Sequence, residues 1–493
     1  MKEMLAAQRD SFMAALPEPL SVRKDRLKRA AAMIRDHADR FCDALSEDFG
    51  HRSREQSMIT DIGGSIGPID HALKNLDKWA KPEKRGVQFP LNLLGAKAWV
   101  EYQPKGVIGV IAPWNFPVNL VMSPLAGVFA AGNRAMVKTS EYTPVTAALF
   151  EEIVGRYFDP TELAFVSGGP EVGKAFAELP FDHLLFTGST NVGHHVMRAA
   201  AANLTPVTLE LGGKSPEIIG PHADFERAVE RILVGKLLNA GQTCIAPDYV
   251  LLPRGREAAF TQAYRAAVAR LFPRLEGNPD YAAIVSDRHW ARLHDLLRDA
   301  RAGGARVQDV GPPAGAASAT RSDAAPRQLR PALVFGAQPA MRLLQEEIFG
   351  PILPVLPSDT PDEAIAHVNA GPRPLALYWF GTDTAARDRV LRGTTSGGVT
   401  VNDTLIHITH ERLPFGGVGA SGWGAYHGET GFLRFSQQKS VNPVALGHGS
   451  QAVSALWRAL RSHDEPSPAL VAVSGRAVER RYNCGLFTTS RFR

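Results

Sequence analysis

Three side chains that could act together on a carbonyl group stand in Gly- and Pro-rich runs of this sequence: Cys244, Glu210 and Asn115. A cysteine thiolate can add to a carbonyl carbon, and a side-chain amide can hold the oxyanion that forms. A carboxylate can then activate water to release the product. Cys244 ends the run Asn239–Cys244, Glu210 lies 34 positions before it, and Asn115 follows Pro113-Trp114. The three residue types together predict covalent catalysis on an aldehyde.

Each of these residues also has a purely structural interpretation. A free cysteine is often a buried apolar side chain, and an Asn between two prolines often forms a turn. Glu210, in the apolar run Val207–Leu211, could be held in an ion pair. Burial there should raise its pKa and help it to take a proton from water. Small residues around Cys244 leave room for an incoming aldehyde, as the catalytic interpretation requires, and from the residues alone both interpretations stay open.

A nucleotide cofactor is indicated by the run Gly188-Ser189-Thr190-Asn191-Val192-Gly193, which follows a predicted strand and opens a predicted helix. Backbone N–H groups at such a helix N-terminus can bind a pyrophosphate. The run does not have the GxGxxG spacing, and Gly turns between a strand and a helix are common. By itself it is therefore a weak signal.

Together with two further runs, these segments resemble the NAD(P)-dependent aldehyde dehydrogenase superfamily. The resemblance extends from about residue 20 to about residue 440. Each motif alone is weak, whereas six of them in order at sensible spacing are highly specific. They are Pro113–Pro117, Phe186–Thr190 with Gly193, Leu209–Pro216, Asn239–Cys244, Glu346–Pro351 and Leu413–Gly417.

The resemblance implies a role for each member of the predicted catalytic set. Cys244 is the expected nucleophile, and Asn115 and the backbone N–H of Cys244 are expected to hold the oxyanion. Glu210 is expected to activate the water that releases a carboxylic acid. Relatives that pass the acyl group to coenzyme A commonly lack this Glu, so its presence favours hydrolysis. A catalytically silent relative is the other alternative, and a missing Cys or Glu would have marked it.

The resemblance also implies a row of cofactor-binding residues. Lys138 and Glu141 are expected at the adenosine ribose, although surface charges in a helix cap would look the same. A carboxylate such as Glu141 accepts a hydrogen bond from the ribose 2′-hydroxyl and repels a 2′-phosphate, which favours NAD and leaves NADP open. Glu347 and Phe349 are expected at the nicotinamide ribose and ring. The full predicted set is Trp114, Lys138, Glu141, Gly188, Ser189, Gly193, Glu347 and Phe349.

The run Gly424-Ala425-Tyr426-His427-Gly428 and the short N-terminal arm resemble the class-3 and coniferyl aldehyde dehydrogenase branch of the superfamily. That branch implies an aromatic aldehyde such as coniferyl aldehyde, or a medium-chain or fatty aldehyde. It also implies a homodimer. Nothing in the residues themselves identifies the aldehyde.

The elements that must position these residues form an α/β pattern. Continuous apolar runs typical of strands buried on both faces alternate with helical stretches, which predicts parallel doubly wound sheets. A single amphipathic helix is predicted over Ser21–Phe49. We expect a Rossmann-type dinucleotide-binding lobe, an α/β catalytic lobe and a small β oligomerisation extension. The predicted strands are Ala98–Tyr102, Val107–Ile111, Met136–Lys138, Ala164–Val166, His183–Phe186, Glu217–Ile219, Tyr249–Leu252 and Gly398–Val401.

These patterns also suggest domain boundaries. The dinucleotide-binding domain and the catalytic domain should meet near Gly213, with the reacting residues in the cleft between them. An Ala-, Gly-, Pro- and Ser-rich stretch reads as a surface insertion without chemistry. The expected ranges are 1–83 and 105–212 for the dinucleotide-binding domain and 213–408 for the catalytic domain, with insertion 303–331. Ranges 84–104 and 409–445 are expected to form the oligomerisation extension and the segment that leads the chain back to the cofactor and substrate site.

The last 48 residues, 446–493, form an atypical tail with seven Arg, no Lys and three acidic residues. Two interpretations stay open: a divergent segment, or an altered reading frame near Asn442. The absence of Lys mildly favours the second. Cys484 lies in this tail and receives no catalytic role.

Composition limits the remaining classes. The net charge of +5 gives no case for nucleic-acid binding, which needs a concentrated basic face. Three cysteines without a CxxC pair argue against a disulfide framework and for a reducing compartment, hence a cytoplasmic enzyme. No secretory signal and no apolar run of membrane-spanning length are present. His407-x-x-His410-Glu411 is not in HExxH order, and we expect a strand or loop there rather than a metal site.

Overall fold

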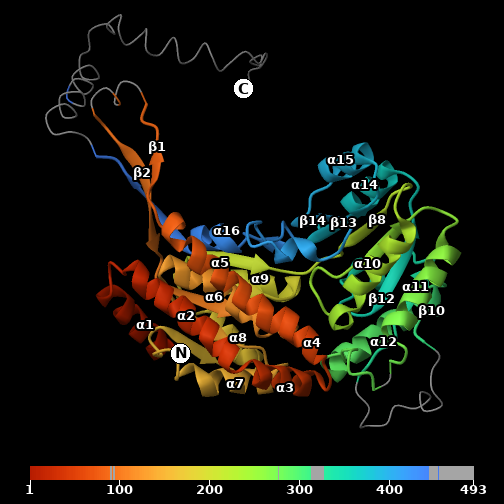
Figure 1. The fold of residues 1–493 in the computed structure, drawn as a ribbon, viewed down its shortest axis with the longest axis horizontal. Coiled ribbons are helices and arrows are strands. Elements are labelled where there is room, and N and C mark those ends of the chain that lie inside the picture. The colour runs from red at the N-terminus through yellow and green to blue at the C-terminus, as the bar shows by residue number, and fades with distance from the viewer. Residues whose placement is uncertain (89–91, 93–94, 276, 313–326, 444–453, 455–493) are drawn as a thin grey trace, which may run out of the picture. The chain divides into compact units, whose positions relative to one another are not determined.

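The computed structural model describes residues 1–88, 92, 95–275, 277–312, 327–443 and 454 (Figure 1). The chain forms two compact units, Met1–Lys81 with Tyr102–Gln438, and Pro82–Glu101 with Lys439–Arg493. Residues 313–326 of the predicted insertion and nearly all of the Arg-rich tail, Cys484 included, lie outside the described residues. None of the described helices is long and apolar enough to cross a bilayer.

The larger unit begins with a series of helices. The single helix predicted over Ser21–Phe49 is wrong, because the chain breaks at His37, whose φ and ψ of −120° and 18° are not helical. The break lets the first half pack against α5 and α6 while the second half packs against α7. These helices are α1 (Lys2–Ala14), α2 (Leu20–Asp36), α3 (Ala38–Phe49), α4 (Arg54–Ser57), a π-helical turn (Met58–Gly63) and α5 (Gly64–Trp79).

The first sheet has six strands in the order β15-β7-β6-β3-β4-β5. All its pairings are parallel except that of β15, which runs antiparallel to β7. The strands are β3 (Val107–Ile111), β4 (Arg134–Lys138), β5 (Leu163–Val166), β6 (His183–Thr187), β7 (Val207–Glu210) and β15 (Gly422–Trp423), and the connecting helices are α6 (Asn119–Ala131), α7 (Pro144–Val154), α8 (Pro170–Ala177) and α9 (Thr190–Ala201). The predicted strands of this lobe are confirmed.

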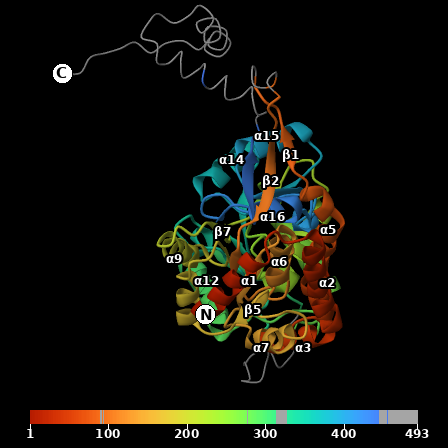
Figure 2. The same cartoon turned by 90° about the vertical axis from the view of Figure 1, so that its left-hand side faces the viewer.

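Both faces of this sheet are covered, which explains its continuous apolar strands. In β3, Ile108 and Val110 pack in the same cluster as residues of α2, α3, α5, α6 and α7. Val107 and Ile111 pack on the opposite face with residues of α1, α8 and α9. Figure 2 shows α2 and α5 on one side of the sheet and α9 on the other.

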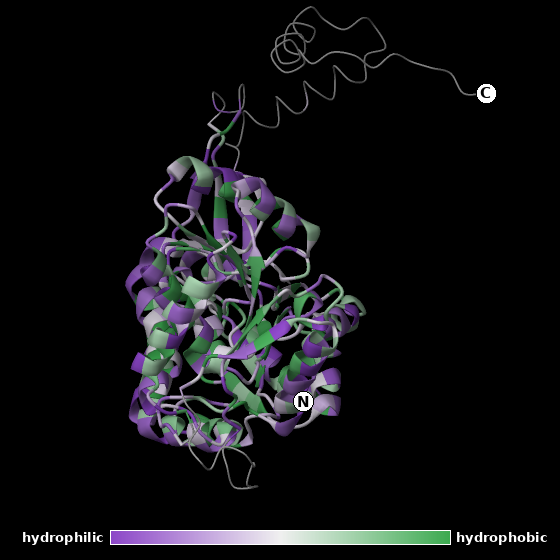
Figure 3. Ribbon diagram, turned by 90° about the vertical axis from the view of Figure 1, so that its right-hand side faces the viewer, coloured by the Kyte–Doolittle hydropathy of each residue, from purple (hydrophilic) through white to green (hydrophobic). Residues whose placement is uncertain are grey.

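The second sheet has seven strands in the order β10-β11-β12-β9-β8-β13-β14. Only β10 is antiparallel to its neighbour. Its central strands are strongly apolar in Figure 3. The strands are β8 (Pro216–Ile219), β9 (Tyr249–Leu252), β10 (Arg306–Asp309), β11 (Ala332–Phe335), β12 (Ile352–Pro357), β13 (Ala376–Phe380) and β14 (Gly398–Val401), and the helices are α10 (Phe225–Leu237), α11 (Glu257–Leu271), α12 (Asp287–Ala302), α13 (Arg342–Gln345), α14 (Pro361–Ala370) and α15 (Thr384–Gly393).

After β14 the chain passes through irregular segments to β15 and α16 (Gly428–Arg434). His407 lies in a 3-10 helix, Ile406–Thr409, so the strand or loop predicted there is wrong. The backbone reverses direction at Leu405, whose φ is 63°, and this turn starts the short helix. Among the described residues no cluster of three His, Cys, Asp or Glu side chains is placed to hold a metal ion.

A small sheet has three strands in the order β1-β2-β16, and β1 lies wholly in the second unit. Its strands are β1 (Glu83–Arg85), β2 (Ala98–Pro104) and β16 (Ser436–Val441), and β1 runs antiparallel to β2. The predicted strand Ala98–Tyr102 is confirmed. The predicted α/β class, with two α/β lobes and a small β extension, is confirmed as well.

Candidate active site

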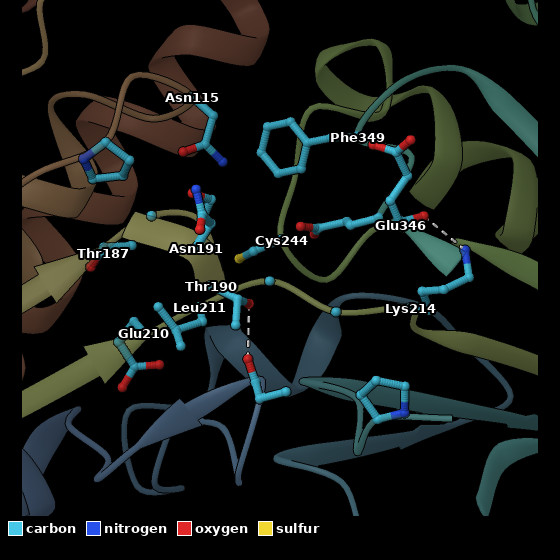
Figure 4. A pocket seen from close by; sticks show the side chains of 18 of the residues that line it. Asn115, Thr187, Thr190, Asn191, Glu210, Leu211, Lys214, Cys244, Glu346 and Phe349 are labelled. Carbon is cyan, nitrogen blue, oxygen red and sulfur yellow. Dashed lines mark hydrogen bonds between the residues drawn. The ribbon is translucent and has the colours of Figure 1, made fainter. Parts of the chain in front are cut away.

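A cavity of about 570 Å³ lies in the larger unit and is lined by segments from both large sheets. The segments after β3, β6 and β7 reach it, as do the Cys244 turn and the segment before β12. Ligand sites in parallel α/β sheets form at the carboxyl ends of the strands, because side chains of the following loops converge there. Figure 4 shows Asn115, Glu210, Cys244 and Phe349 around this cavity.

Asn115 is buried in the loop between β3 and α6. Its side-chain nitrogen donates to the carbonyl of Gln242 over 3.1 Å. An amide nitrogen carries two hydrogens, so a second donor remains on the same group. In Figure 4 this side chain points toward the part of the cavity where Cys244 lies.

Cys244 is half-buried in the turn that follows a 3-10 helix, Leu238–Gly241. The pKa of its thiol is raised to about 12, mainly by burial and in addition by the charges of Glu347 and Glu210. Backbone N–H groups of Cys244 and Ile245 act in the opposite direction. The protein without ligand therefore holds a neutral thiol at this position.

Glu210 ends β7 and is almost completely buried. Neither of its carboxylate oxygens has a hydrogen-bond partner among the described residues. Burial raises the pKa of this carboxyl well above its usual value, and Arg434 offsets only part of that effect. Figure 4 shows Glu210 beside Thr187 and Leu211.

The run Gly188–Gly193 forms the turn from β6 into α9, as its Gly content predicts. Ser189 caps α9, and its hydroxyl accepts a hydrogen bond from the backbone of Val192. A Cβ on Gly193 would lie 2.8 Å from Leu211, so this glycine lets α9 approach the segment after β7. The lining of the cavity includes Gly188 and Ser189.

Lys138 and Glu141 lie farther along the same edge of the sheet. Lys138 ends β4, and its ammonium forms an ion pair of 2.9 Å with Glu141. The Lys138 side chain is buried, whereas that of Glu141 is 36% exposed. Neither residue lines the 570 Å³ cavity, and Gly193 does not line it either.

Glu347, Phe349 and Trp114 also line the cavity. Burial raises the pKa of Glu347 to about 8, with Asp248 adding to the effect and the backbone N–H of Gly213 opposing it. A Cβ on Gly212 would collide with the Glu347 carboxylate, so Gly212 is what allows this carboxylate to lie so close to the backbone. The ring of Phe349 meets that of Trp114 edge to face, with centroids 5.3 Å apart.

Several lining residues were missed from the sequence. His289 stacks obliquely on Trp114 with centroids 4.9 Å apart, and Arg292 donates to the carbonyl of Glu347 over 3.2 Å. Both lie on α12, where no motif marks them. Lys214, in contrast, belongs to the Leu209–Pro216 run and could have been singled out. It forms an ion pair with Asp248 and donates to the carbonyl of Glu346 (Figure 4).

Comparison with known proteins gives a consistent result. The sequence model of the Aldehyde dehydrogenase family matches residues 1–441. The chain is 52% identical to a probable coniferyl aldehyde dehydrogenase of Caulobacter vibrioides, covering 90% of each chain. It is 50% identical to a coniferyl aldehyde dehydrogenase of Pseudomonas sp., covering 86% of this chain and 87% of that one. A substrate-bound structure of Staphylococcus aureus AldH is similar with a TM-score of 0.83 and 36% identity, covering 92% of this chain and 99% of that one.

The charge of Glu347 should control the reactivity of Cys244. Because Glu347 ionises near pH 8 and its charge raises the thiol pKa, we expect Glu347→Gln to speed alkylation of Cys244 by iodoacetamide about 3–10-fold above pH 8. The gain should shrink below pH 8, where the carboxyl of the unaltered protein is protonated. Glu346→Gln, next to it but paired with Arg342 at 2.7 Å, is the matched control. Equal alkylation rates of the two variants would contradict the coupling.

Proposed function

The chain belongs to the aldehyde dehydrogenase family, and we propose that it oxidises an aromatic aldehyde such as coniferyl aldehyde to the carboxylic acid. Its general activity is that of an NAD(P)-dependent aldehyde dehydrogenase. The names of the two relatives at 52% and 50% identity support the aromatic substrate. The proposal is carried by one observation: Cys244, Asn115 and Glu210, from three separate segments, line a single cavity.

We propose that Cys244 forms the covalent bond to the substrate. Its thiolate adds to the aldehyde carbon, and the carbonyl oxygen becomes an oxyanion. The side-chain amide of Asn115 and the backbone N–H of Cys244 donate to that oxyanion. Loss of the hydride from the same carbon leaves a thioester on Cys244.

The thioester is then hydrolysed. We propose that Glu210 takes a proton from the attacking water and passes it to the departing Cys244 sulfur, which releases the carboxylic acid and restores the thiol. A buried carboxyl with a raised pKa accepts a proton more readily than an exposed one, and Glu210 has this property. Glu210 is thus a stronger base than an exposed carboxylate.

The residues beside Cys244 fit a nicotinamide dinucleotide. The N-terminus of α9 at Ser189 offers backbone N–H groups to a pyrophosphate, and the turn at Gly188 leaves the backbone accessible. Glu347 would accept hydrogen bonds from the nicotinamide ribose, with Phe349 and Trp114 near the ring. When bound, the nicotinamide supplies the acceptor for the hydride.

We propose that NAD is preferred over NADP. Glu141 is partly exposed at the end of β4, and Lys138 holds its carboxylate in place. A carboxylate there would accept a hydrogen bond from the ribose 2′-hydroxyl and repel a 2′-phosphate. We also propose a reducing compartment such as the cytoplasm, because the chemistry requires Cys244 as a free thiol.

The substrate and cofactor proposals predict a ranking in steady-state assays. With NAD, kcat/KM for coniferyl aldehyde should exceed that for acetaldehyde, and NADP should support a lower kcat/KM than NAD. A panel of aromatic, medium-chain and short aldehydes assayed with each coenzyme measures this. Faster turnover of acetaldehyde would refute the aromatic substrate while leaving the general activity intact.

Removing the proposed base should separate the two half-reactions. We expect Glu210→Gln to lower steady-state turnover about 10²–10⁴-fold while one equivalent of NADH per site still forms in a burst. The reason is that the thioester forms but is hydrolysed slowly. In the unaltered protein NADH formation should not need coenzyme A. Dependence on added coenzyme A would favour acyl transfer instead.

We propose that the protein is a homodimer held in part by the three-stranded unit. All three residues of strand β1 are exposed in the single chain, so a partner chain could cover them. Sedimentation at micromolar concentration should give a mass of twice 53.3 kDa. A monomer under those conditions would exclude this assembly.

A further inference from the structure

A buried polar network joins the loop that carries Asn115 to the turn that carries Cys244. Its centre is Asn239, which is fully buried. The side-chain nitrogen of Asn239 donates to the carbonyl of Asn115 over 3.0 Å and to the carbonyl of Gln242 over 3.2 Å. Asn115 donates to the same Gln242 carbonyl over 3.1 Å. Two amide groups from separate segments thus share one acceptor, two residues before Cys244.

Gln56 on α4 fixes Asn239, the centre of this network, through two hydrogen bonds. The backbone N–H of Asn239 donates to the Gln56 side-chain oxygen over 2.9 Å. The Gln56 side-chain nitrogen donates in turn to the Asn239 side-chain oxygen over 3.4 Å. That second bond fixes which end of the Asn239 amide faces Asn115, because only the nitrogen can donate to carbonyl groups.

A buried ion pair supports the Asn115 loop from another direction. Arg52 donates to the carbonyl of Asn115 over 3.0 Å and to the carboxylate of Asp61 over 2.6 Å. Both side chains are fully buried, and the rings of Phe49 and Phe116 lie 4.8 Å and 5.0 Å from the guanidinium. The carbonyl of Asn115 therefore has two donors, Arg52 and Asn239, which fix the backbone of this loop.

The turn that carries Cys244 is conformationally strained. Asn239 and Ala240 both have φ of 51° and ψ of 33°. A left-handed alanine costs roughly 1–2 kcal/mol, and such residues persist only where the surroundings determine their conformation. Gln242 provides part of that restraint, because its side chain donates to the carbonyls of Asn239 and Ala283 over 2.9 Å and 3.0 Å.

We infer that Asn239 is a positioning residue for the oxyanion site. Its one NH₂ group donates both hydrogens, one to the Asn115 backbone and one to the turn before Cys244. It thereby fixes the distance between the Asn115 amide and the Cys244 N–H, the two donors assigned to the oxyanion. This inference rests on the proposed role of Asn115 and adds a residue that acts through it.

The direct test is Asn239→Ala in a stopped-flow assay of the NADH burst with coniferyl aldehyde and NAD. A misplaced oxyanion donor should slow the burst about 10–100-fold, less than the full loss of a donor. The KM of the aldehyde should change by less than about threefold, since the ground state gains little from this donor. An unchanged burst would overturn the inference.

A second measurement separates positioning from general damage to the nucleophile. Iodoacetamide alkylates the thiolate without forming an oxyanion, so the alkylation rate of Cys244 should stay within about threefold of the unaltered protein. A fall in alkylation as large as the fall in the burst would mean that Asn239 only shapes the Cys244 turn. That result would also overturn the inference.

A double-mutant cycle tests whether Asn239 acts through Asn115. If it does, Asn239→Ala should have little further effect in an Asn115→Ala background, because coupled residues are not additive. Additive effects would overturn the inference while leaving the proposed function intact. A normal burst in Asn115→Ala alone would instead show that the oxyanion role assigned to Asn115 is wrong.

Asn133→Ala is the matched control. Asn133 is equally buried and makes four hydrogen bonds, accepting from the backbone N–H groups of Lys105 and Gly106 and donating to the carbonyls of Val128 and Phe435. It does not line the cavity, so its burst rate per folded molecule should be normal. An equal slowing in the control would overturn the inference.

Gln56→Ala keeps the test decisive if Asn239→Ala does not fold, because Gln56 is only partly buried. It removes one bond that orients the Asn239 side-chain amide and one that holds the Asn239 backbone N–H. We expect a burst slowed about 3–10-fold with normal alkylation, a smaller effect because Asn239 itself remains. A burst as fast as that of the unaltered protein would count against the inference.

Discussion

Desolvation is the constraint on which the rest of this site depends. Cys244, Glu210 and Glu347 lie in one cavity, and burial is the largest cause of the raised pKa of each. The charges of Glu347 and Glu210 also raise the pKa of the Cys244 thiol, so ionising the thiol beside both carboxylates is costly. The nucleophile is thus largely neutral until the reaction begins. Negative charge appears on it only as the reaction proceeds, and fixed donors act on that charge in a medium of low dielectric constant.

The scaffold meets this constraint by fixing its polar groups before the reaction. Asn115, Asn239 and Gln242 are fully or almost fully buried, and each has backbone partners that determine where its amide points. Asn115 follows the carboxyl end of β3, whereas Asn239 and Gln242 precede the amino end of β9, so a loop of one sheet meets a turn of the other. Ala240 has an unfavourable left-handed conformation, so the surroundings of the turn before Cys244, and not the local preference of the backbone, determine its shape.

Much of this arrangement could be predicted from the sequence, and the failures have physical causes. Strands such as Val107–Ile111 are continuous apolar runs because helices cover both their faces, and that signal is strong. The break at His37 was missed because the apolar period continues across it, and only packing against different partners separates α2 from α3. His289 and Arg292 reach the cavity from one face of α12, where helical spacing looks like any half-exposed surface. The bonds of Asn239 could not be foreseen, since they join segments more than a hundred residues apart.

Strand β7, which carries Glu210, pairs with a strand that the ribosome synthesises much later. On one side β7 pairs with β6, but on the other it pairs with β15, where Gly422 stands opposite Glu210. A side chain at position 422 would collide with the backbone of Leu209, so the match is close. At about 5–20 residues per second, the ribosome needs roughly 10–40 s to reach Gly422 after adding Glu210. Throughout that interval the edge of β7, the strand that carries Glu210, has no partner strand. An open strand edge can pair with other chains, so this is the period when a chaperone would matter most.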